Sequence, residues 1–451
     1  MGRQIEELAQ FVAQTRWDDI PEPVQRHVKL VLLDTLGVIL AGAERPELRQ
    51  LRDRLAATAG RGATVFARGW PNHEPRTAAL LNGIAGRSIE LCEGLRFVSG
   101  QPAVQVLPGV LAVGEHLGSS GPEMLAAFVL GYDVAARLSG GFTPRPLAHQ
   151  NGQVSLLAAA AAGARLHGLD AAGISRAMRI ATILLLTPSY TNAVAGATAL
   201  NVAGGMSGLA AALAPELVLA GFTAQEDAIE EALGNLVGSK FTPESLSEDL
   251  GGIWHITRNY FRLYACCNPI HPALDCLHDA LAELQPKPDQ IERIDIATYR
   301  FASVMRDPEP PNYFASKYSL PHAAAAMAVR GRAGYAALDD SALDDPAIAA
   351  LRRRVRVMED PAMSPVAPRL KPARVTLTLS DGRQSIHARN SHRGDFQEPF
   401  AESEIRAKFH ELARVVLTPE GATNVEDAVE RCEHWTSAVE LTEVLRCHGR
   451  S

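Results

Sequence analysis

The stretch Val154–Leu166, VSLLAAAAAGARL, decides the fold class of this chain. It is almost entirely small and apolar, which is typical of a helix that is buried on all sides. Its apolar run, Ser155–Ala164, is shorter than the roughly 20 strongly apolar residues that span a bilayer. Because small side chains let helix axes approach closely, we predict that this segment is the buried helix of a tightly packed bundle.

Helical spacing continues on both sides of this segment. Apolar residues recur three or four positions apart before it, as in Val24, Val28 and Val31. Glycine-rich breaks then separate further apolar segments. The helices predicted in this way, besides the first, are Leu107–Leu117, Pro122–Leu138 and Ala171–Leu185.

The pattern changes near residue 285, where Pro286-Lys287-Pro288 interrupts the helices. Alternating apolar residues after this break are typical of strands. The predicted strands begin at Ile291 and cover Val355–Met358 and Ala373–Leu379, the last turning at Ser380–Arg383 into a hairpin with Ser385–Arg389. Helical patterns lie at Pro321–Val329, Pro346–Arg354 and Glu402–Val416.

These segments predict a mostly α protein with two domains. A large all-helical domain comprises residues 1–280 plus 395–451, and a smaller α+β lid domain, residues 281–394, is inserted into it. A length of 451 residues agrees with about two domains. The cleft between them is the natural place for a ligand.

Composition excludes several functional classes. Hydrophobic residues make up 47% and charged residues 21%, as in globular proteins, and the net charge of −7 argues against a nucleic-acid binder. The six cysteines are too sparse for a disulfide scaffold and match no zinc-binding spacing. We find no signal peptide and no span long enough for a membrane, so we expect a cytoplasmic protein with no membrane partner and no metal.

Short catalytic motifs are absent from the sequence. It contains no GxxxxGK[ST] loop, no GxGxxG after a strand, no HExxH and no GxSxG. The residues taken alone therefore predict a fold class but no reaction.

Four stretches together resemble the MmgE/PrpD family, and they occur in the order that the family has. This family includes 2-methylcitrate dehydratases, cis-aconitate decarboxylases and an iminodisuccinate epimerase. The resemblance implies a helical domain with an inserted lid domain, usually as a homodimer. The stretches are LLDTLGVILAG at 32–42, NGIAGRSIELCEG at 82–94, QPA at 101–103 and FRLYACC at 261–267.

The resemblance also implies a chemistry that uses no metal and no organic cofactor. A proton is taken from the carbon beside a carboxylate, and water or carbon dioxide is lost or the proton returns. Such a reaction needs a base with a tuned pKa and groups that hold negative charge. By this resemblance the catalytic candidates are His149, His271, Glu90 and His322, although each histidine would also suit a loop or a helix start.

The substrate-binding candidates implied by the resemblance include positions where this chain departs from the family. Gln101 stands where members have histidine, Cys92 replaces an acid, and near Asn201 the usual lysine or arginine is missing. A less charged pocket than usual is therefore expected. The candidates are Arg262, Gln101, Cys267, Asn201, Lys317 and Tyr318.

Three functions are consistent with this sequence. The first is a dehydratase-like lyase that acts on a small organic acid by proton abstraction. The second is an isomerase, epimerase or cyclase that acts on a less charged metabolite in a specialised biosynthetic pathway. The third is a homologue without catalytic activity. The size and polarity of the pocket discriminate between the first two.

Overall fold

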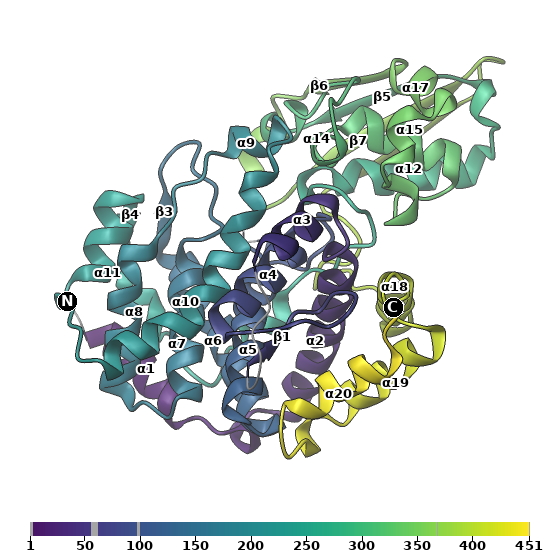
Figure 1. Cartoon of the computed structure of the whole chain (residues 1–451). Helices are drawn as coiled ribbons and strands as arrows, with labels where there is room; N and C mark the ends of the chain where they lie inside the picture. The colour runs from purple at the N-terminus through teal and green to yellow at the C-terminus, as the bar shows by residue number, and fades with distance from the viewer. Residues whose placement is uncertain (1–2, 56–61, 97–99, 368, 451) are drawn as a thin grey trace.

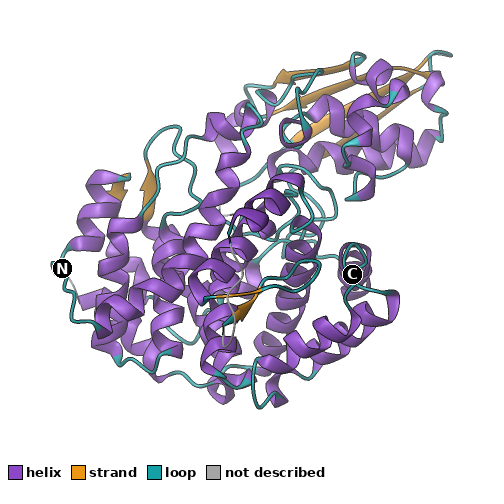
Figure 2. Cartoon of the chain, viewed as in Figure 1, coloured by secondary structure: helices purple, strands orange, loops and turns teal. Residues whose placement is uncertain are grey.

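The chain is mostly helical (Figure 2). The computed structural model describes residues 3–55, 62–96, 100–367 and 369–450. Its first part contains α1 (Arg3–Gln14), α2 (Glu22–Gly42), α3 (Pro46–Arg54), α4 (Pro75–Arg87), α5 (Pro102–Leu117), α6 (Gly121–Gly141), α7 (Val154–Leu166), α8 (Ala171–Ala181), α9 (Tyr190–Val194), α10 (Val202–Leu219) and α11 (Ala228–Glu231). Two short strand pairs accompany them: β1 (Ala63–Thr64) with β2 (Asn72–His73), and β3 (Phe142–Pro144) with β4 (Gly238–Phe241).

Helix α7 confirms the prediction from which the sequence analysis began. It covers Val154–Leu166, and each of its residues from Val154 to Ala164 is buried. It packs against α5, α6, α8 and α10. The bounds of two neighbours differ from the prediction, since α5 begins at Pro102 and α8 ends at Ala181, where a 3₁₀ turn follows.

Close contact between α4 and α10 depends on glycine. A Cβ atom on Gly83 would lie 2.6 Å from the carbonyl oxygen of Gly204. A Cβ atom on Gly204 would lie equally close to Cγ of Arg87, at 2.6 Å. Because any side chain at these two positions would push the helices apart, the glycines fix the place of Arg87 at the end of α4.

A four-stranded sheet with helices on it forms the second part of the molecule. Its strand order is β6-β5-β7-β8, with β5 and β6 parallel and the other pairs antiparallel. The predicted hairpin is confirmed, with Ala373 opposite Arg389 and Thr378 opposite Gln384. The strands are β5 (Ile291–Thr298), β6 (Val355–Glu359), β7 (Ala373–Leu379) and β8 (Gln384–Arg389). The helices are α12 (His271–Leu284), α13 (Arg300–Ser303), α14 (Tyr313–Ser316), α15 (Leu320–Arg330), α16 (Ser341–Asp344) and α17 (Pro346–Arg352).

After the sheet the chain returns to the first helices, as predicted. Helices α18 (Glu402–Ala413), α19 (Pro419–Glu430) and α20 (Val439–His448) complete the chain, and α18 and α19 pack against α2. A buried ion pair joins Lys408 Nζ to Asp34 Oδ1 at 2.6 Å. Figure 1 shows these C-terminal helices beside the purple α2, on the side away from α11.

Two hydrophobic cores accompany this arrangement. One is built from the N-terminal and C-terminal helices, and the second from residues of α12, α15 and the four-stranded sheet. Helix α12 packs on β7 and β8, so it lies with the sheet. Among the described residues one helical stretch, Thr198–Leu219, is long and apolar enough to cross a membrane, but 61% of its most apolar window is buried, as in a core helix.

Candidate functional site

A cavity of about 550 Å³ lies where the helical part meets the sheet-bearing part. The first part contributes residues from α4 and from the loops around residues 90, 148 and 262. The second contributes Tyr299, Phe301, Tyr318 and Lys371. The remaining lining residues are Arg87, Glu90, Leu95, Gln101, Leu147, Ala148, His149, Gln150, Tyr190, Tyr260, Arg262, Cys267, Asn268, Pro269 and Ala367.

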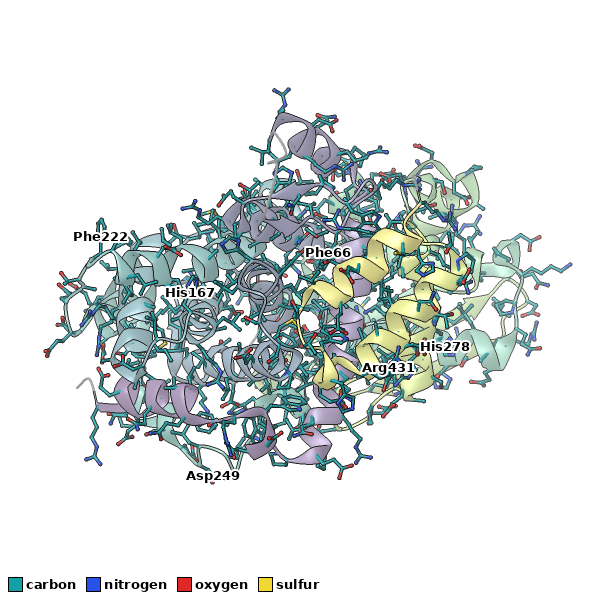
Figure 3. All side chains as sticks on the ribbon, turned by 60° about the horizontal axis from the view of Figure 1, so that its bottom comes forward. Phe66, His167, Phe222, Asp249, His278 and Arg431 are labelled. Carbon is teal, nitrogen blue, oxygen red and sulfur yellow. The ribbon has the colours of Figure 1, made fainter. Side chains whose placement is uncertain are left out.

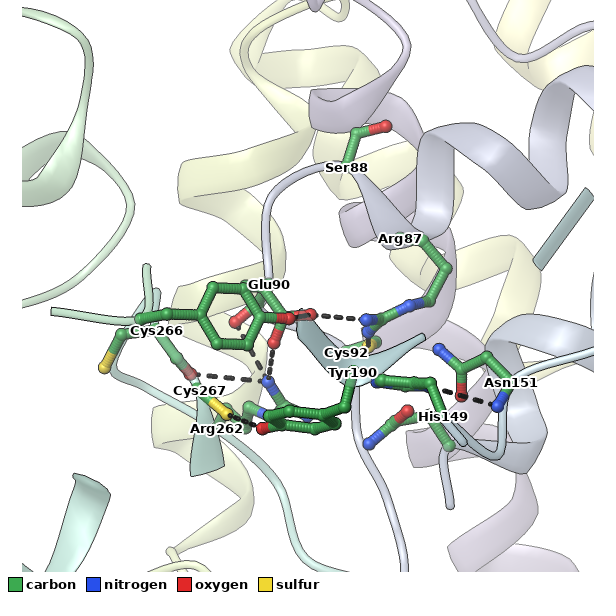
Figure 4. A network of polar contacts seen from close by, with 12 residues as sticks. Arg87, Ser88, Glu90, Cys92, His149, Asn151, Tyr190, Arg262, Cys266 and Cys267 are labelled. Carbon is green, nitrogen blue, oxygen red and sulfur yellow. Dashed lines mark hydrogen bonds and ion pairs between the residues drawn. The ribbon is translucent and has the colours of Figure 1, made fainter. Parts of the chain in front are cut away.

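One end of this cavity has a buried charge cluster, which we call the charged end: Arg87, Glu90, Arg262 and Tyr318 (Figure 4). Glu90 accepts hydrogen bonds from three partners. Arg87 Nη2 and Tyr318 Oη donate to Oε1, the latter at 3.0 Å, and Arg262 Nη1 donates to Oε2 at 2.8 Å. Arg87 Nη1 also lies 3.1 Å from Cys92 Sγ. Two guanidinium groups share one carboxylate, so the cluster has a net positive charge.

The backbone and pKa of Glu90 both reflect this position. Its φ of +51° lies in the left-handed region, which costs free energy for a residue with a side chain and is found at functional sites. Burial alone would raise the pKa of Glu90, but the guanidinium groups of Arg87 and Arg262 lower it to about 2. Glu90 is therefore ionised at neutral pH and holds the two arginines in place rather than exchanging protons.

His149 is held in a loop that several hydrogen bonds fix. Its backbone N–H donates to the carbonyl oxygen of Pro188 at 2.8 Å, and the N–H of Gly152 donates to Gln105 Oε1 at 2.8 Å. The backbone N–H of Asn151 donates to Nδ1 of His149 at 3.2 Å. Since Nδ1 accepts this bond, the proton of the neutral ring is on Nε2.

The ring of His149 is stacked on that of Tyr190, with centroids 5.3 Å apart and planes 11° apart. The two side chains lie side by side in Figure 4. Burial, together with the nearby Arg87 guanidinium and against the opposing effect of the Glu90 carboxylate, lowers the pKa of His149 to about 3. His149 is therefore a neutral N–H donor at physiological pH, suited to hold a developing negative charge.

A second chain of polar contacts reaches the cavity from the sheet-bearing part. Lys371 Nζ donates to Asn268 Oδ1, and Asn268 Nδ2 donates to His392 Nε2 at 2.8 Å. His392 Nδ1 in turn donates to the carbonyl oxygen of Arg393 at 2.8 Å. Burial lowers the pKa of Lys371 to about 7, with Cys267 opposing this shift and Arg262 adding to it. A lysine with such a pKa exchanges protons readily at neutral pH.

Six of the ten residues predicted for the site line the cavity together. They are Glu90, Gln101, His149, Arg262, Cys267 and Tyr318. Cys267 is a neutral thiol, because burial and the Glu90 carboxylate raise its pKa to about 12. It therefore lacks the thiolate that a nucleophile needs. The side chain of Gln101 keeps a buried Oε1 without a hydrogen-bond partner among the described residues.

The other four predicted residues are not among those that line the cavity. His271 is buried and bonded through Nε2 to the carbonyl oxygen of Cys266 at 3.0 Å. His322 is buried 3.5 Å from Arg352 Nη1, and Lys317 donates to the carbonyl oxygen of Leu338. Asn201 is buried at the start of α10. The family resemblance selected these four positions, but it did not determine where their side chains point.

Arg87, Lys371, Asn268 and Tyr190 line the cavity although the sequence analysis did not select them. Arg87 had a detectable signal, because it ends a glycine-containing helix that is mostly apolar from Ala78 to Gly86, and because it precedes Glu90 by three positions. Lys371 had none, since it lies before a strand more than a hundred residues from the other cavity residues it contacts. In the described part of the chain no group of three or more histidine, cysteine or acidic side chains is arranged to hold a metal ion.

Comparisons with known proteins cover nearly the whole chain. The MmgE/PrpD N-terminal domain matches residues 6–242, and the MmgE/PrpD C-terminal domain matches residues 264–434. A cis-aconitate decarboxylase of Aspergillus terreus is 23% identical over 99% of this chain and 96% of its own length. A cis-aconitate decarboxylase-like protein of Aspergillus oryzae is 24% identical over 98% and 97%. The cis-aconitate decarboxylase of Mus musculus is 23% identical over 98% and 93%.

These matches confirm the resemblance that the four sequence stretches indicated. Both halves of the family pattern are present, in order, and the relatives are enzymes matched over almost their full length. The chain is accordingly an enzyme, and its relatives support a lyase-type activity. It belongs to the MmgE/PrpD family.

Proposed function

We propose that this enzyme removes water or carbon dioxide from an organic acid with fewer carboxylates than cis-aconitate, without a cofactor. The observation that carries this proposal is the cavity itself. It combines a positively charged end with a lysine of pKa about 7 and a neutral histidine N–H. The lysine is a proton-transfer group, and the histidine is a donor to negative charge.

The charge of the cavity supports a substrate with one or two carboxylates. Arg87 and Arg262 together exceed Glu90 by one positive charge, and Lys371 adds a second when it is protonated. Gln101 adds none. Guanidinium groups bind carboxylates well, because their N–H groups match the two oxygens. A tricarboxylate would have more negative charge than this cavity can balance.

A dehydration in this cavity has a simple proton balance. The neutral amine of Lys371 takes the proton from the carbon beside the carboxylate, and the C–O bond on the next carbon breaks. The departing hydroxide receives this proton from the ammonium group of Lys371 and leaves as water, which restores the neutral amine. Nε2–H of His149 stabilises the negative charge that develops on the carboxylate oxygens. For a decarboxylation the C–C bond to a carboxylate breaks instead, carbon dioxide leaves, and protonated Lys371 supplies the proton to the remaining carbon.

The apolar wall of the cavity favours a second candidate function. Leu147, Phe301 and Tyr190 line it beside the charged end. Such a wall suits an isomerase, epimerase or cyclase on a less charged metabolite, which would return the proton instead of losing a group. The same two residues, Lys371 and His149, would serve that reaction.

The proposal also includes the arrangement of the two domains. We propose that the lid domain predicted for residues 281–394 also includes the first turns of α12, which packs on β7 and β8, and that substrate enters between this lid and the helical domain. That the enzyme is a cytoplasmic homodimer stays a prediction.

Proton NMR in D2O tests the proposal. The protein is incubated with citrate, 2-methylcitrate, cis-aconitate and a set of less charged unsaturated and keto acids, beside His149→Ala and Lys371→Met. His278→Ala is the matched control, because His278 is exposed on α12. We expect loss of water or carbon dioxide from a less charged acid, in the parent protein and in the control but not in the two variants.

Other results would contradict parts of the proposal. Turnover of the tricarboxylates alone would overturn the substrate class. Exchange of a carbon-bound proton for deuterium without loss of a group would establish the isomerase. Equal activity in Lys371→Met and the parent would exclude Lys371 from the reaction.

A further inference from the structure

We infer that the acid substrate has an apolar substituent, an alkyl or aryl group, that lies in an apolar vestibule outside the charged end. The vestibule is defined by Leu147, Tyr190, Val194, Phe301 and Val304. This inference rests on the proposed function, since it names the class of acid that the same site accepts.

The vestibule adjoins the cavity of the site. It encloses about 720 Å³ and shares five lining residues with the charged cavity. A substituent on a ligand whose carboxylate lies at Arg87 and Arg262 would therefore need to pass only these shared residues to reach the vestibule. Those shared residues are Leu147, Tyr190, Tyr299, Phe301 and Ala367.

The walls of the vestibule are apolar side chains that face solvent. Leu147 is 71% exposed, Val304 54% and Phe301 44%. Exposed apolar side chains that gather in a hollow indicate a binding surface, whereas scattered ones do not. Arg300 is the charged residue of the lining among the described residues. Apart from Arg300, the described lining offers no cation to a carboxylate, so the rest of this surface suits a hydrocarbon group.

The backbone at Leu147 supports the same reading. Its φ of +66° lies in the left-handed region, which is unfavourable for leucine. The carbonyl oxygen of Leu147 accepts a bond from the N–H of Tyr190 at 2.7 Å, and this bond holds the loop against α9. An apolar side chain is thus kept in solvent, at the mouth of the site, by a strained backbone. Strain of this kind persists at ligand-binding positions.

Calorimetric titration with succinate and its 2-methyl, 2-butyl and 2-hexyl derivatives tests the inference. Since burial of one methylene group corresponds to about fourfold in affinity, we expect a gain of about two- to fourfold per added methylene. In Val304→Asp this dependence on chain length should be lost, and in Val304→Leu it should be kept. Both substitutions are at a side chain that is largely exposed, so the fold should tolerate them.

Phe222→Asp is the control for an added charge on an exposed apolar residue. Phe222 is 58% exposed, and Figure 3 places it at the edge of the helical part, beyond α10. This variant should keep the parent dependence on chain length. Sedimentation velocity on the same proteins tests the alternative that another copy of the chain, and not the substrate, occupies the vestibule.

The outcomes separate this inference from the proposed function. Binding of all four acids with equal affinity would overturn the apolar subsite and leave the charged end intact. Binding of none of them would contradict the charged end as an acid site, and with it both proposals. Dissociation of a dimer by Val304→Asp, with the chain-length dependence unchanged, would show that the vestibule is an interface between copies and would overturn the inference.

Discussion

The two ends of the cavity are built on opposite principles. At the charged end Arg87, Glu90 and Arg262 are almost fully buried, and Glu90 is bonded to both arginines. In the vestibule Leu147 and Val304 are largely exposed. The first region is fixed before any ligand arrives, whereas the second gains most of its contacts from a ligand.

This difference indicates that residues of the charged end serve the reaction, whereas residues of the vestibule select the substrate. Buried charges must be paired, so a change at one of them disturbs the others. Exposed apolar residues have no such constraint, and they can change without loss of the fold. We therefore expect large, coupled effects at the charged end and small, specific ones toward the vestibule.

The largest expected effect is at Glu90. Glu90→Gln keeps the size of the side chain but leaves two buried guanidinium groups without their carboxylate, so the free energy of unfolding should fall by about 3–5 kcal/mol. Urea denaturation measures it. The matched control is Glu309→Gln, whose half-exposed carboxylate pairs with Arg352 and Arg353, and there we expect little or no loss. An equal loss of unfolding free energy in the two variants would contradict the claim that the buried charges of the charged end depend on one another.

His149 should affect rate more than stability. His149→Ala removes the Nε2–H donor, so turnover of the acid identified by NMR should fall by about 10²–10³. The ring is partly exposed to the cavity, and urea denaturation should therefore show little change. His278→Ala, on the exposed face of α12, should alter neither quantity. A variant with parent-like turnover would remove His149 from the mechanism.

Lys371 should lower the stability of the fold at neutral pH although the reaction needs it. Its pKa is about 7 in the folded protein, against a usual value of 10.5, so the unfolded chain binds more protons between pH 7 and pH 10.5. The free energy of unfolding of the parent protein therefore increases as the pH rises through that window. At or below pH 7, Lys371 destabilises the fold.

Lys371→Met should remove that contribution and stabilise the protein by about 1 kcal/mol or more at pH 7, with a smaller gain at pH 9. Urea denaturation at the two pH values measures both. Lys240→Met, at an exposed position of β4, is the control and should change stability at neither pH. A gain of equal size at both pH values would contradict the lowered pKa.

The smallest effect is expected at Cys267, which lies between the two regions. Its raised pKa of about 12 leaves almost no thiolate at pH 7, so iodoacetamide should label the exposed Cys447 and spare Cys267. Mass spectrometry of the peptides reports the sites. Cys267→Ser should change turnover by less than about fivefold. Rapid labelling of Cys267 with loss of activity would point to a reactive thiol.

Local patterns were sufficient for the parts of the fold that local forces determine. Helix α7 and the hairpin β7–β8 were predicted with nearly their observed bounds, because periodicity and turn residues set them. The order β6-β5-β7-β8 was not predicted. Strand order depends on contacts between segments far apart in the chain, which periodicity does not encode.

The site was predicted in part for a similar reason. The resemblance placed Glu90, His149 and Arg262 in the right loops, and all three line the cavity. It also selected His271, which bonds to its own turn instead. Lys371 was missed because its role arises from burial beside Asn268 and Arg262, and a lowered pKa is a property of the folded surroundings and not of the local sequence.

The proposed reaction depends on proton exchange by Lys371 in the cavity. The most direct test is the pH dependence of the turnover rate, followed by proton NMR, in the parent protein and in Lys371→Met. We predict that the parent rate changes through an apparent pKa near 7, and that the variant is at least a hundredfold slower with no such step. An unchanged step near pH 7 in a variant of undiminished rate would contradict it.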